Sequence, residues 1–579
     1  MATGEVISAH HDDIPHALAV LEHAPVIVGH NIIGFDIIAL QKVFPHWKPK
    51  GRIFDTLNAS RLIWPELRDD DFAAARAAQR QCKSWPLPAA LYGSHKLEAW
   101  GYRLGVYKGE FGKTTDWSVW TPEMQEYCEQ DVEVTEALFR YILTKGYSKE
   151  ALALEMAFQK CIAEQEIFGF PFDTAKAEAL YADLMAQRAE LDMELREIFP
   201  DKIEHESFTP KRSNKRYGYI EGKTITKTRI IAFNPKSNQH IADRLMEKYG
   251  WIPEQLTPTE DPMVDEGVLK SLQYPEAKLL VKYRELQKII AMLAEGPTGW
   301  LKLVTPEGRI HGRVITNGTV SGRCSHSKPN LGQVPKKGDL GQRCRELFHA
   351  PKEWVMVGAD ASGLELRVFG HFLARYDGGR YAKEVIQGDV HTLNQKAAGL
   401  LTRDDAKTFI YAFLYGAGPV LLGAFIVPDG TPEQKKKAGL KLIGRFLSRT
   451  PAIKKLKEAL SAILSTRKHL KGMEGRLLKV RSKHSALNLI FQSAGALMVK
   501  LATVLWHEKL AAEHGLVHGV DYKQVVHVHD EVQAVCKPEY AELVGKTFVE
   551  AIEAAGKHFA FRVAMTGEYK IGNNWKETH

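Results

Sequence analysis

The sequence has few cysteines, and they are not grouped. Its six cysteines are spread between positions 82 and 536 without a CxxC pair. This spacing excludes a zinc ribbon and a disulfide framework, so the cysteines are expected to be reduced and structural. The sequence also lacks a run of about 18 apolar residues, and its first residues contain neither a signal-peptide pattern nor a cleavage site. We therefore expect no membrane contact and a cytoplasmic protein.

Internal repeats, low-complexity tracts and long linkers are absent as well. A chain of 579 residues with 44% apolar and 26% charged residues has the composition of an ordinary globular protein, but it is too long for one hydrophobic core. Three or four packed domains are expected. Residues 1 to about 145 alternate short apolar strands with helical stretches, residues 149–302 are mostly helical, and strands and helices mix from about residue 309 onward.

The net charge of +8 is modest, but the positive charge is concentrated in two segments. The segment from Lys435 to Lys483 contains many cations and only two acids, Glu458 and Glu474. Residues 211–229 combine cations with two tyrosines. Cationic runs are often solvated helix faces, yet solvated faces usually alternate in sign. These runs instead favour surfaces that follow a polyphosphate backbone.

Two apolar strands end in carboxylates. Asp360 closes EWVMVGAD, and the adjacent Asp530 and Glu531 interrupt VVHVHDEV. Each aspartate alone could be a simple turn residue. Two adjacent acids in an apolar hairpin, however, are costly unless a cation or hydrogen-bond donors offset their desolvation. The two segments together predict a site for divalent cations.

A third segment, RDDAKTFIYAFLYGAG, places two cations and two tyrosines at intervals of four. On a helix, Arg403, Lys407, Tyr411 and Tyr415 would form one stripe. Cations suit phosphates, and rings suit a sugar and a base, so the stripe matches a nucleoside triphosphate. An amphipathic helix with an incidental stripe is the alternative when the segment is taken alone.

These three segments, in this order, resemble motifs A, B and C of the family A (DNA polymerase I type) DNA polymerases. The family's RxxxKxxxF/YxxxYG pattern reads here as Arg403 to Gly416, and DASGLELR and HDE are similar to the branch of T7-like bacteriophage replicative polymerases. Further stretches resemble the same branch: NGTVSGRCSHSKPNLGQVP, GDVHTLNQ, SALNLIFQSAGALM and the C-terminal GNNWKETH.

The resemblance implies an α/β and α+β multidomain fold, a right-hand polymerase with an N-terminally truncated ribonuclease H-like 3′–5′ exonuclease domain. The expected divisions are 1–148 for the exonuclease-like domain, 149–305 for the thumb with a short basic insertion at 201–232, 306–380 and 485–579 for the palm, and 381–484 for the fingers.

The resemblance also implies a two-metal phosphoryl transfer with Mg²⁺, for which Mn²⁺ can substitute. Asp360 and Asp530 are expected to hold both ions with the carbonyl of Ala361, and Glu531 to support them. Arg403 and Lys407 would bind the triphosphate, and Lys407 could protonate the pyrophosphate. His391 would add a phosphate contact, or else be an ordinary helix-start histidine.

Nucleotide and DNA contacts follow from the same resemblance. Glu365 is expected to close the pocket around the sugar C2′ position, which selects dNTPs, and Tyr411 is expected to allow ready use of dideoxynucleotides. Tyr415 would stack at the templating position. The expected contacts to primer-template are Arg323, Asn488, Gln492 and His529, although a structural role for His529 is nearly as well supported.

The exonuclease resemblance is incomplete. HNIIGFD supplies Asp36, and YCEQDVEVT supplies Tyr127 and Asp131, but no strand bearing DxE precedes Val26. The chain is therefore expected to begin partway into the exonuclease fold. Two carboxylates cannot offset the repulsion between two divalent ions, so proofreading is expected to be absent or severely weakened.

The thumb also departs from the phage branch, because residues 201–232 are much shorter than the insertion that grips thioredoxin. A thioredoxin partner is therefore doubtful, and the cations of this segment could hold duplex DNA directly. If about six phosphates are neutralised, the logarithm of affinity should fall against the logarithm of salt with a slope of roughly −5. A phage helicase-primase or single-strand binding protein is a possible partner, and a monomer is expected.

Three alternatives are left open by the sequence. A single-subunit RNA polymerase shares the two aspartates, but Glu365 and the Pol I-type spacing argue against it. A catalytically dead DNA-binding protein would explain the broken exonuclease, but not the complete polymerase motifs. A repair or translesion polymerase of family A would usually carry long insertions, which are not seen.

Overall fold

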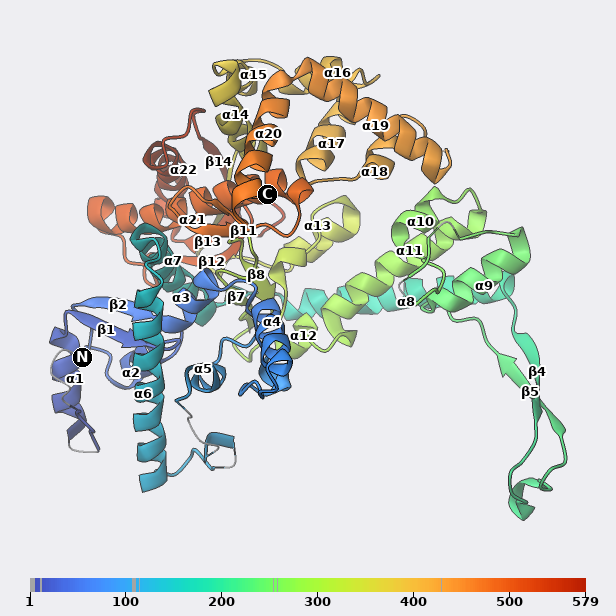
Figure 1. Cartoon of the computed structure of the whole chain (residues 1–579), viewed down its shortest axis with the longest axis horizontal. Helices are drawn as coiled ribbons and strands as arrows, with labels where there is room; N and C mark the ends of the chain where they lie inside the picture. Colours follow the sequence, from blue (N-terminus) through green and yellow to red (C-terminus); the bar gives the residue numbers. More distant parts are fainter. Residues whose placement is uncertain are drawn as a thin grey trace.

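The fold is described from a computed structural model, which covers residues 6–10, 13–106, 111–113, 115–253, 255–257, 259–428 and 430–579. Figure 1 shows an open, hand-like arrangement in which the fingers helices stand above the thumb helices and the N-terminal unit lies on the other side of the palm. None of the six cysteines forms a disulfide. Four are buried or half-buried, whereas Cys82 and Cys128 are exposed.

The described part of the N-terminal unit contains a sheet of only two parallel strands. The apolar run after Pro25 forms the first strand, which pairs with the second in the register Val26↔Arg52 to Gly29↔Asp55. Helices pack around this pair, with Trp100 and Leu138 in the core. The elements are α1 (Ile14–His23), β1 (Val26–Gly29), α2 (Asp36–Val43), β2 (Arg52–Asp55), α3 (Thr56–Ile63), α4 (Leu67–Arg80), α5 (Leu97–Leu104) and α6 (Pro122–Thr144).

The thumb consists of long helices and one projecting ribbon. The segment GFPFD (169–173) separates the first two helices. Gly169 ends the first helix with a positive φ of +70°, and Asp173 caps the second by accepting the Lys176 N–H at 3.0 Å. The elements are α7 (Lys149–Phe168), β3 (Phe170–Pro171), α8 (Thr174–Ile198), β4 (Lys202–Phe208), β5 (Ile225–Ile231), α9 (Asn238–Tyr249), α10 (Glu266–Ser271), α11 (Pro275–Ile290) and α12 (Trp300–Leu303).

The palm is built on a four-stranded antiparallel sheet in the order β12-β13-β9-β14. Strands β9, β12 and β13 are almost entirely buried, whereas the edge strand β14 alternates between half-buried and exposed residues; α22 packs on β9 and β14, and α7 packs on β12. The elements are β9 (Val355–Ala361), α14 (Leu364–Asp377), α21 (Ala486–His514), β12 (Tyr522–Val528), β13 (Glu531–Cys536), α22 (Ala541–His558) and β14 (Gly567–Gly572).

A smaller part of the palm precedes this sheet. Residues 309–315 (RIHGRVI) form two short strands, because His311 and Gly312 interrupt the run and the halves pair with different partners. The elements are β6 (Arg309–Ile310), β7 (Arg313–Ile315), β8 (Ser325–Ser327) and α13 (Gly338–Glu346).

One stretch among the described residues, Lys483–His514, has the length and apolar composition of a membrane span. It contains α21, and 78% of its most apolar window is buried inside the protein. Its hydrophobicity is therefore that of a core helix around which the palm packs.

The fingers, as far as the structure describes them, are six helices and a small hairpin. Two of these helices, α18 and α19, approach closely because Gly423 and Gly439 face each other; a Cβ on Gly423 would lie 1.7 Å from the carbonyl oxygen of Lys435. The elements are α15 (Arg380–Gln387), α16 (Val390–Ala398), α17 (Arg403–Leu414), α18 (Pro419–Gly423), α19 (Pro432–Arg449), α20 (Pro451–Thr466), β10 (His469–Lys471) and β11 (Leu477–Lys479).

Candidate active site

The palm sheet brings Asp360, in strand β9, beside Asp530, which immediately precedes the adjacent strand β13. Asp360 stands in β9 and pairs across the sheet with Glu531 of β13, and the backbone carbonyl of Asp530 accepts the N–H of Ala361 at 3.2 Å. A two-residue turn, His529 and Asp530, joins β12 to β13. Acids separated by 170 positions in the sequence therefore meet at one end of the sheet.

These acids raise one another's pKa. Burial raises the pKa of Asp530 to about 6, helped by the charges of Glu365, Asp360 and Glu531. Burial also raises the pKa of Asp360, with further contributions from Glu568 and Glu531. Glu568 lies directly opposite Asp360 on β14. Glu568 was not predicted from the sequence, because nothing in the strand GEYKIG distinguishes it from an ordinary surface glutamate.

The carboxylate of Glu531 is held by the C-terminal residues. Its Oε1 accepts from Trp575 Nε1 at 2.5 Å, and its Oε2 lies 2.8 Å from His579 Nδ1. Arg345 adds an ion pair at 3.6 Å, and these partners lower the pKa of Glu531 against the effect of burial. Both oxygens of Glu531 are occupied, which suits a supporting carboxylate. No role was predicted for Arg345, Trp575 or His579, although the C-terminal stretch GNNWKETH resembles the phage branch.

Helix α17 carries the predicted cations beside this sheet. Thr402 caps the helix by accepting the Asp405 N–H at 3.0 Å. Arg403 forms an ion pair with Asp389 at 2.9 Å, and Asp389 in turn caps α16. Lys407 is exposed and forms no ion pair with a described residue. Asp389, a residue of the GDVHTLNQ stretch, was not predicted as a partner of Arg403.

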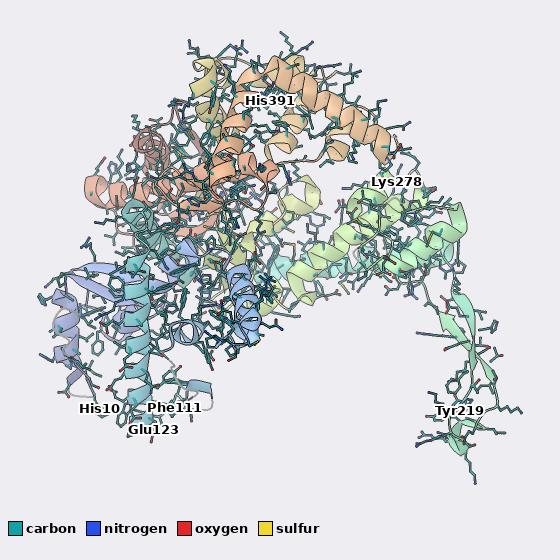
Figure 2. The ribbon with its side chains drawn as sticks, in the orientation of Figure 1. His10, Phe111, Glu123, Tyr219, Lys278 and His391 are labelled. Carbon is teal, nitrogen blue, oxygen red and sulfur yellow. The ribbon has the colours of Figure 1, made fainter. Side chains whose placement is uncertain are left out.

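His391 and Tyr411 connect this helix with the acids. The two rings lie 6.4 Å apart, and His391 belongs to the fingers (Figure 2). Burial lowers the pKa of His391, as do the charges of Arg403 and Lys407. Burial raises the pKa of Tyr411, and Glu365 and Asp530 add to the effect. The predicted phosphate-binding and metal-binding residues thus share one electrostatic environment.

Tyr415, predicted as the last residue of the helical stripe, lies just beyond the helix, because α17 ends at Leu414 and Tyr415 is its C-terminal cap. Its hydroxyl donates to Glu365 Oε1 at 2.7 Å, and its carbonyl accepts from Asn488 Nδ2 at 2.8 Å. The first of these contacts joins the predicted sugar-selecting residue to the predicted templating residue. The pocket around it is lined by Arg323, Leu364, Glu365, Val368, Leu414, Tyr415, Asn488, Phe491, Gln492 and Gly495.

His529 is the remaining predicted DNA contact, and it shares a second, smaller cavity with Arg323. Its φ of +57° is unusual for a residue other than glycine and places it at the tip of the turn before Asp530. Burial lowers its pKa, and so does the charge of Arg323. A strained turn residue beside the predicted metal ligands is consistent with either of its two expected roles.

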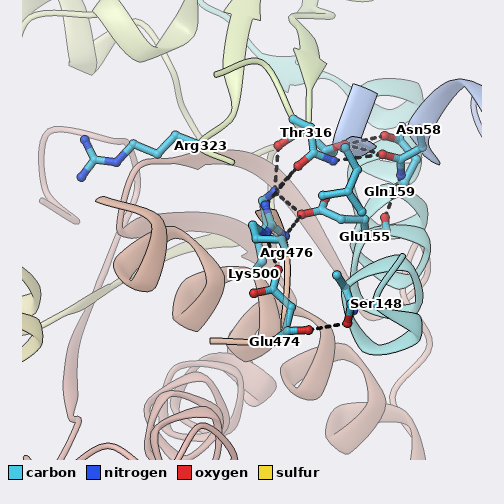
Figure 3. A network of polar contacts seen from close by, with 12 residues as sticks. Asn58, Ser148, Glu155, Gln159, Thr316, Arg323, Glu474, Arg476 and Lys500 are labelled. Atoms are coloured by element: carbon cyan, nitrogen blue, oxygen red, sulfur yellow. Dashed lines mark hydrogen bonds and ion pairs between the residues drawn. The ribbon is translucent and has the colours of Figure 1, made fainter. Parts of the chain in front are cut away.

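A buried polar network supports the loop that presents Arg323 (Figure 3). Glu155 Oε1 accepts from Arg476 Nη2 at 2.6 Å and from Lys500 Nζ at 2.7 Å. Lys500 also donates to the carbonyl of Thr316 at 2.8 Å, and Arg476 Nη1 donates to Asn317 Oδ1 at 3.3 Å. The base of the loop is therefore fixed by two fully buried cations.

The N-terminal unit takes part in this network. Asn58 Nδ2 donates to the carbonyl of Glu155 at 2.8 Å, while its Oδ1 accepts from Asn317 Nδ2 at 3.2 Å. At the other end of the loop, Gly322 has a φ of +81°, and a Cβ there would lie 2.0 Å from Arg476 Nη1. No local pattern in the sequence indicates this network, because its members come from segments far apart along the chain.

The donor set at the sheet suits a hard divalent cation. It consists of carboxylate oxygens and the backbone at Ala361, and burial together with the neighbouring acids raises the pKa of both Asp360 and Asp530. Among the described residues no three His, Cys, Asp or Glu side chains form a group that could hold a metal ion. Two aspartates with open positions suit Mg²⁺, which usually keeps water and substrate phosphates as further ligands.

The exonuclease-like residues also approach one another. Asp36 begins α2 and Asp131 lies on α6 with Tyr127. Burial raises the pKa of Asp36, and the charge of Asp131 adds to it. The neighbouring Asp55 is occupied structurally, since it accepts N–H bonds from Asn31, Ile33, Leu57 and Asn58. No strand precedes β1 among the described residues.

Comparisons with known proteins agree with this geometry. Residues 209–577 match the model of DNA polymerase family A. The DNA-directed DNA polymerase of Escherichia phage T7 is 36% identical, covering 100% of this chain and 96% of its own length, and that of Enterobacteria phage T3 is 36% identical over 97% and 93%. DNA polymerase I of Aquifex aeolicus is 26% identical over 95% and 88%.

A solved structure shares the fold. The POL domain of Pol1 from M. smegmatis, in complex with DNA primer-template and dNTP, matches 98% of this chain and 90% of its own with a TM-score of 0.72 at 16% identity. The alignment with the T7 enzyme spans 693 positions, so that relative contains segments with no counterpart among the 579 residues here.

The site and the fold are those of a template-directed nucleic acid polymerase of the right-hand type. The chain belongs to DNA polymerase family A, in the branch of T7-like phage enzymes, and is a DNA-directed DNA polymerase. The single-subunit RNA polymerase alternative is thereby set aside. Members of this family generally use divalent metal ions.

Proposed function

We propose that this polymerase adds dNTPs to a primer 3′-hydroxyl by a two-metal phosphoryl transfer and that it replicates phage DNA without proofreading. The observation that carries the proposal is the approach of Asp360, in β9, to Asp530, in the turn before β13, beside helix α17. Two Mg²⁺ ions bound there would lower the pKa of the primer hydroxyl and neutralise the pyrophosphate. Mn²⁺ would substitute, because it accepts the same oxygen ligands.

The protein's own residues then bind and orient the reactants. Asp360 and Asp530 hold the cations with the carbonyl of Ala361, and Glu531 fixes the end of the sheet through its contacts with Trp575 and His579. Arg403 exchanges its partner Asp389 for a phosphate oxygen when the triphosphate arrives. Lys407, which has no ion-pair partner among the described residues, places its Nζ proton where the leaving pyrophosphate needs it.

Nucleotide choice rests on a contact between palm and fingers. The hydrogen bond from Tyr415 to Glu365 places the Glu365 side chain at the floor of the pocket, where a ribose 2′-hydroxyl would meet it. Tyr411 lies one turn earlier on α17, and its hydroxyl can serve where a dideoxynucleotide lacks the 3′-hydroxyl. His391 adds a phosphate contact beside it.

The primer end is held in the adjoining pockets. Arg323, Asn488 and Gln492 line one of them, and Arg323 and His529 line the next. Side-chain donors at this place suit the minor-groove acceptors that all base pairs share. Such contacts sense the shape of the terminal base pair without reading its sequence.

The proposed loss of proofreading is supported by the remnant itself. Burial and the charge of Asp131 raise the pKa of Asp36, and Asp55 is occupied by four backbone donors. A phage replicative role is favoured over repair by the similarity to the T7 and T3 enzymes. We expect a monomer, with a helicase-primase or single-strand binding protein as possible partners, and location in the cytoplasm of an infected bacterium.

One experiment tests these proposals together. Matched and mismatched primers are extended with Mg²⁺ and either dNTPs or rNTPs, with Asp530→Ala as the control. We expect rapid extension of the matched primer with dNTPs, little with rNTPs, no removal of the mismatched end, and no extension by Asp530→Ala. Fast excision of the mismatch would overturn the proofreading proposal, and activity of Asp530→Ala would overturn the metal assignment.

A further inference from the structure

The ribbon β4–β5 stands apart from the rest of the thumb. It leaves between α8 and α9 and reaches past the helices into solvent (Figure 1), and Tyr219 at its far end is remote from Lys278 on α11 (Figure 2). Its seven residue pairs run from Lys202↔Ile231 to Phe208↔Ile225. At the usual rise per residue the paired strands span roughly 24 Å.

Charge is distributed unevenly along the ribbon. In the paired stalk, Glu204 lies opposite Arg229 and Glu206 lies opposite Lys227, while Lys202 forms an ion pair with Glu247 of α9, so each stalk cation has an acid opposite or beside it. The tip, residues 209–224, contains five cations and one anion, Glu221. The five tip cations are Lys211, Arg212, Lys215, Arg216 and Lys223.

The tip is folded, and its cations lack ionic partners among the described residues. Asn214 and Tyr219 form a bridge, and the Tyr219 ring lies 5.8 Å from Tyr217 and 5.5 Å from Phe208. Every tip cation is exposed and none forms an ion pair with a described residue; the ribbon's own ion pair is Lys202 with Glu247, at its base. A structured loop that presents cations to solvent without anionic partners is arranged for an external anion.

We propose that the ribbon tip is a DNA arm that binds phosphates of duplex DNA behind the polymerase site. Although Tyr217 and Ile220 are exposed, the duplex is the favoured ligand because five exposed cations without ionic partners among the described residues match a regular array of phosphates. The stalk, balanced in charge, spaces the tip away from the thumb by about seven base pairs of duplex at 3.4 Å each. The inference rests on the proposed function.

Two paired substitutions test the arm. Lys211→Gln with Lys215→Gln removes two tip charges, and Lys546→Gln with Lys557→Gln removes two exposed charges from α22 as the matched control. Primer-template affinity is measured against salt, together with processivity in the presence of a heparin trap and the rate of single-nucleotide addition. A shortened ribbon, with Asn-Gly joining Phe208 to Ile225, serves as an independent variant if the tip substitutions misfold.

We expect the tip variant to shift the salt slope by about two towards zero, since each phosphate contact contributes about 0.9. Processivity should fall several-fold while single-nucleotide addition stays at the wild-type rate. Wild-type affinity should also increase when the duplex is lengthened by about seven base pairs, and the shortened ribbon should lose that increment. If the tip variant keeps the wild-type salt slope and processivity, and the shortened ribbon keeps the wild-type dependence on duplex length, the proposal that the tip binds DNA is overturned. An acidic protein would then be the better candidate for the ligand of the tip. Failure of wild-type extension would instead count against the polymerase function.

Discussion

Replacing Glu155 with glutamine should weaken both the fold and the grip on the primer. Glu155 is completely buried, and its Oε1 is shared by the guanidinium of Arg476 and the ammonium of Lys500. The two carboxylates, Glu155 and Glu474, balance the two cations, Arg476 and Lys500. A neutral glutamine at position 155 therefore leaves one buried positive charge without compensation. Breaking a buried ion pair in this way costs about 3–5 kcal/mol. The same change at the exposed Glu136, which pairs with Arg140, should cost no more than about 0.5 kcal/mol.

The functional effect should pass through the loop that presents Arg323. Lys500 and Arg476 hold Thr316 and Asn317 at its base, and Asn58 holds Asn317 from the N-terminal unit. Asn58→Ala removes that support without unbalancing charge, so it is the milder variant if Glu155→Gln fails to fold. We expect it to raise the Kd for primer-template by about 5-fold, with little change in kcat, since a lost buried hydrogen bond costs about 1 kcal/mol.

A double-mutant cycle separates positioning from general destabilisation. If Asn58 acts through Arg323, the effect of Asn58→Ala on primer affinity should disappear in an Arg323→Ala background. Thermal unfolding midpoints rank the stability of each variant, and Glu136→Gln is the control on the same unit. Additive losses in affinity, or a Glu155→Gln protein as stable as the control, would refute the reasoning.

Four further outcomes are expected. At limiting Mg²⁺, the rate of primer extension should rise with pH through a midpoint near pH 6, because Asp530 has a raised pKa of about 6 and must lose its proton to bind metal. The midpoint should move to lower pH as the Mg²⁺ concentration is increased. A midpoint that does not move would contradict the assignment of Asp530 as a metal ligand. Tyr411→Phe should raise discrimination against ddNTPs by roughly 10- to 100-fold, as expected for a hydroxyl contact to a charged group, and equal chain termination by both forms would argue against it. Tyr415→Phe should release Glu365 and increase rNTP incorporation several-fold in single-turnover assays, while the surface control Glu136→Gln behaves as wild type; equal incorporation by all three proteins would count against the Tyr415 contact. Asp131→Asn should leave the removal of a mismatched primer end unchanged, and a slower excision than wild type would reveal a working nuclease.

The sequence by itself determined the family, the order of the three motifs and the identity of the acids and cations. This was possible because Asp360, Arg403 and Asp530 lie in short segments whose local pattern, an apolar strand or a helix, is written in neighbouring residues. The cationic stripe also predicted the helix that became α17, but not that Tyr415 falls just beyond its end.

Only the tertiary structure decided which distant residues share a site. The pairing of β9 with β13 and β14 placed Glu568 opposite Asp360, and the return of the C-terminus placed His579 on Glu531. The network of Glu155, Arg476 and Lys500 joins segments more than 300 positions apart. Such contacts depend on how elements pack rather than on local periodicity, so no pattern of neighbouring residues could have revealed them.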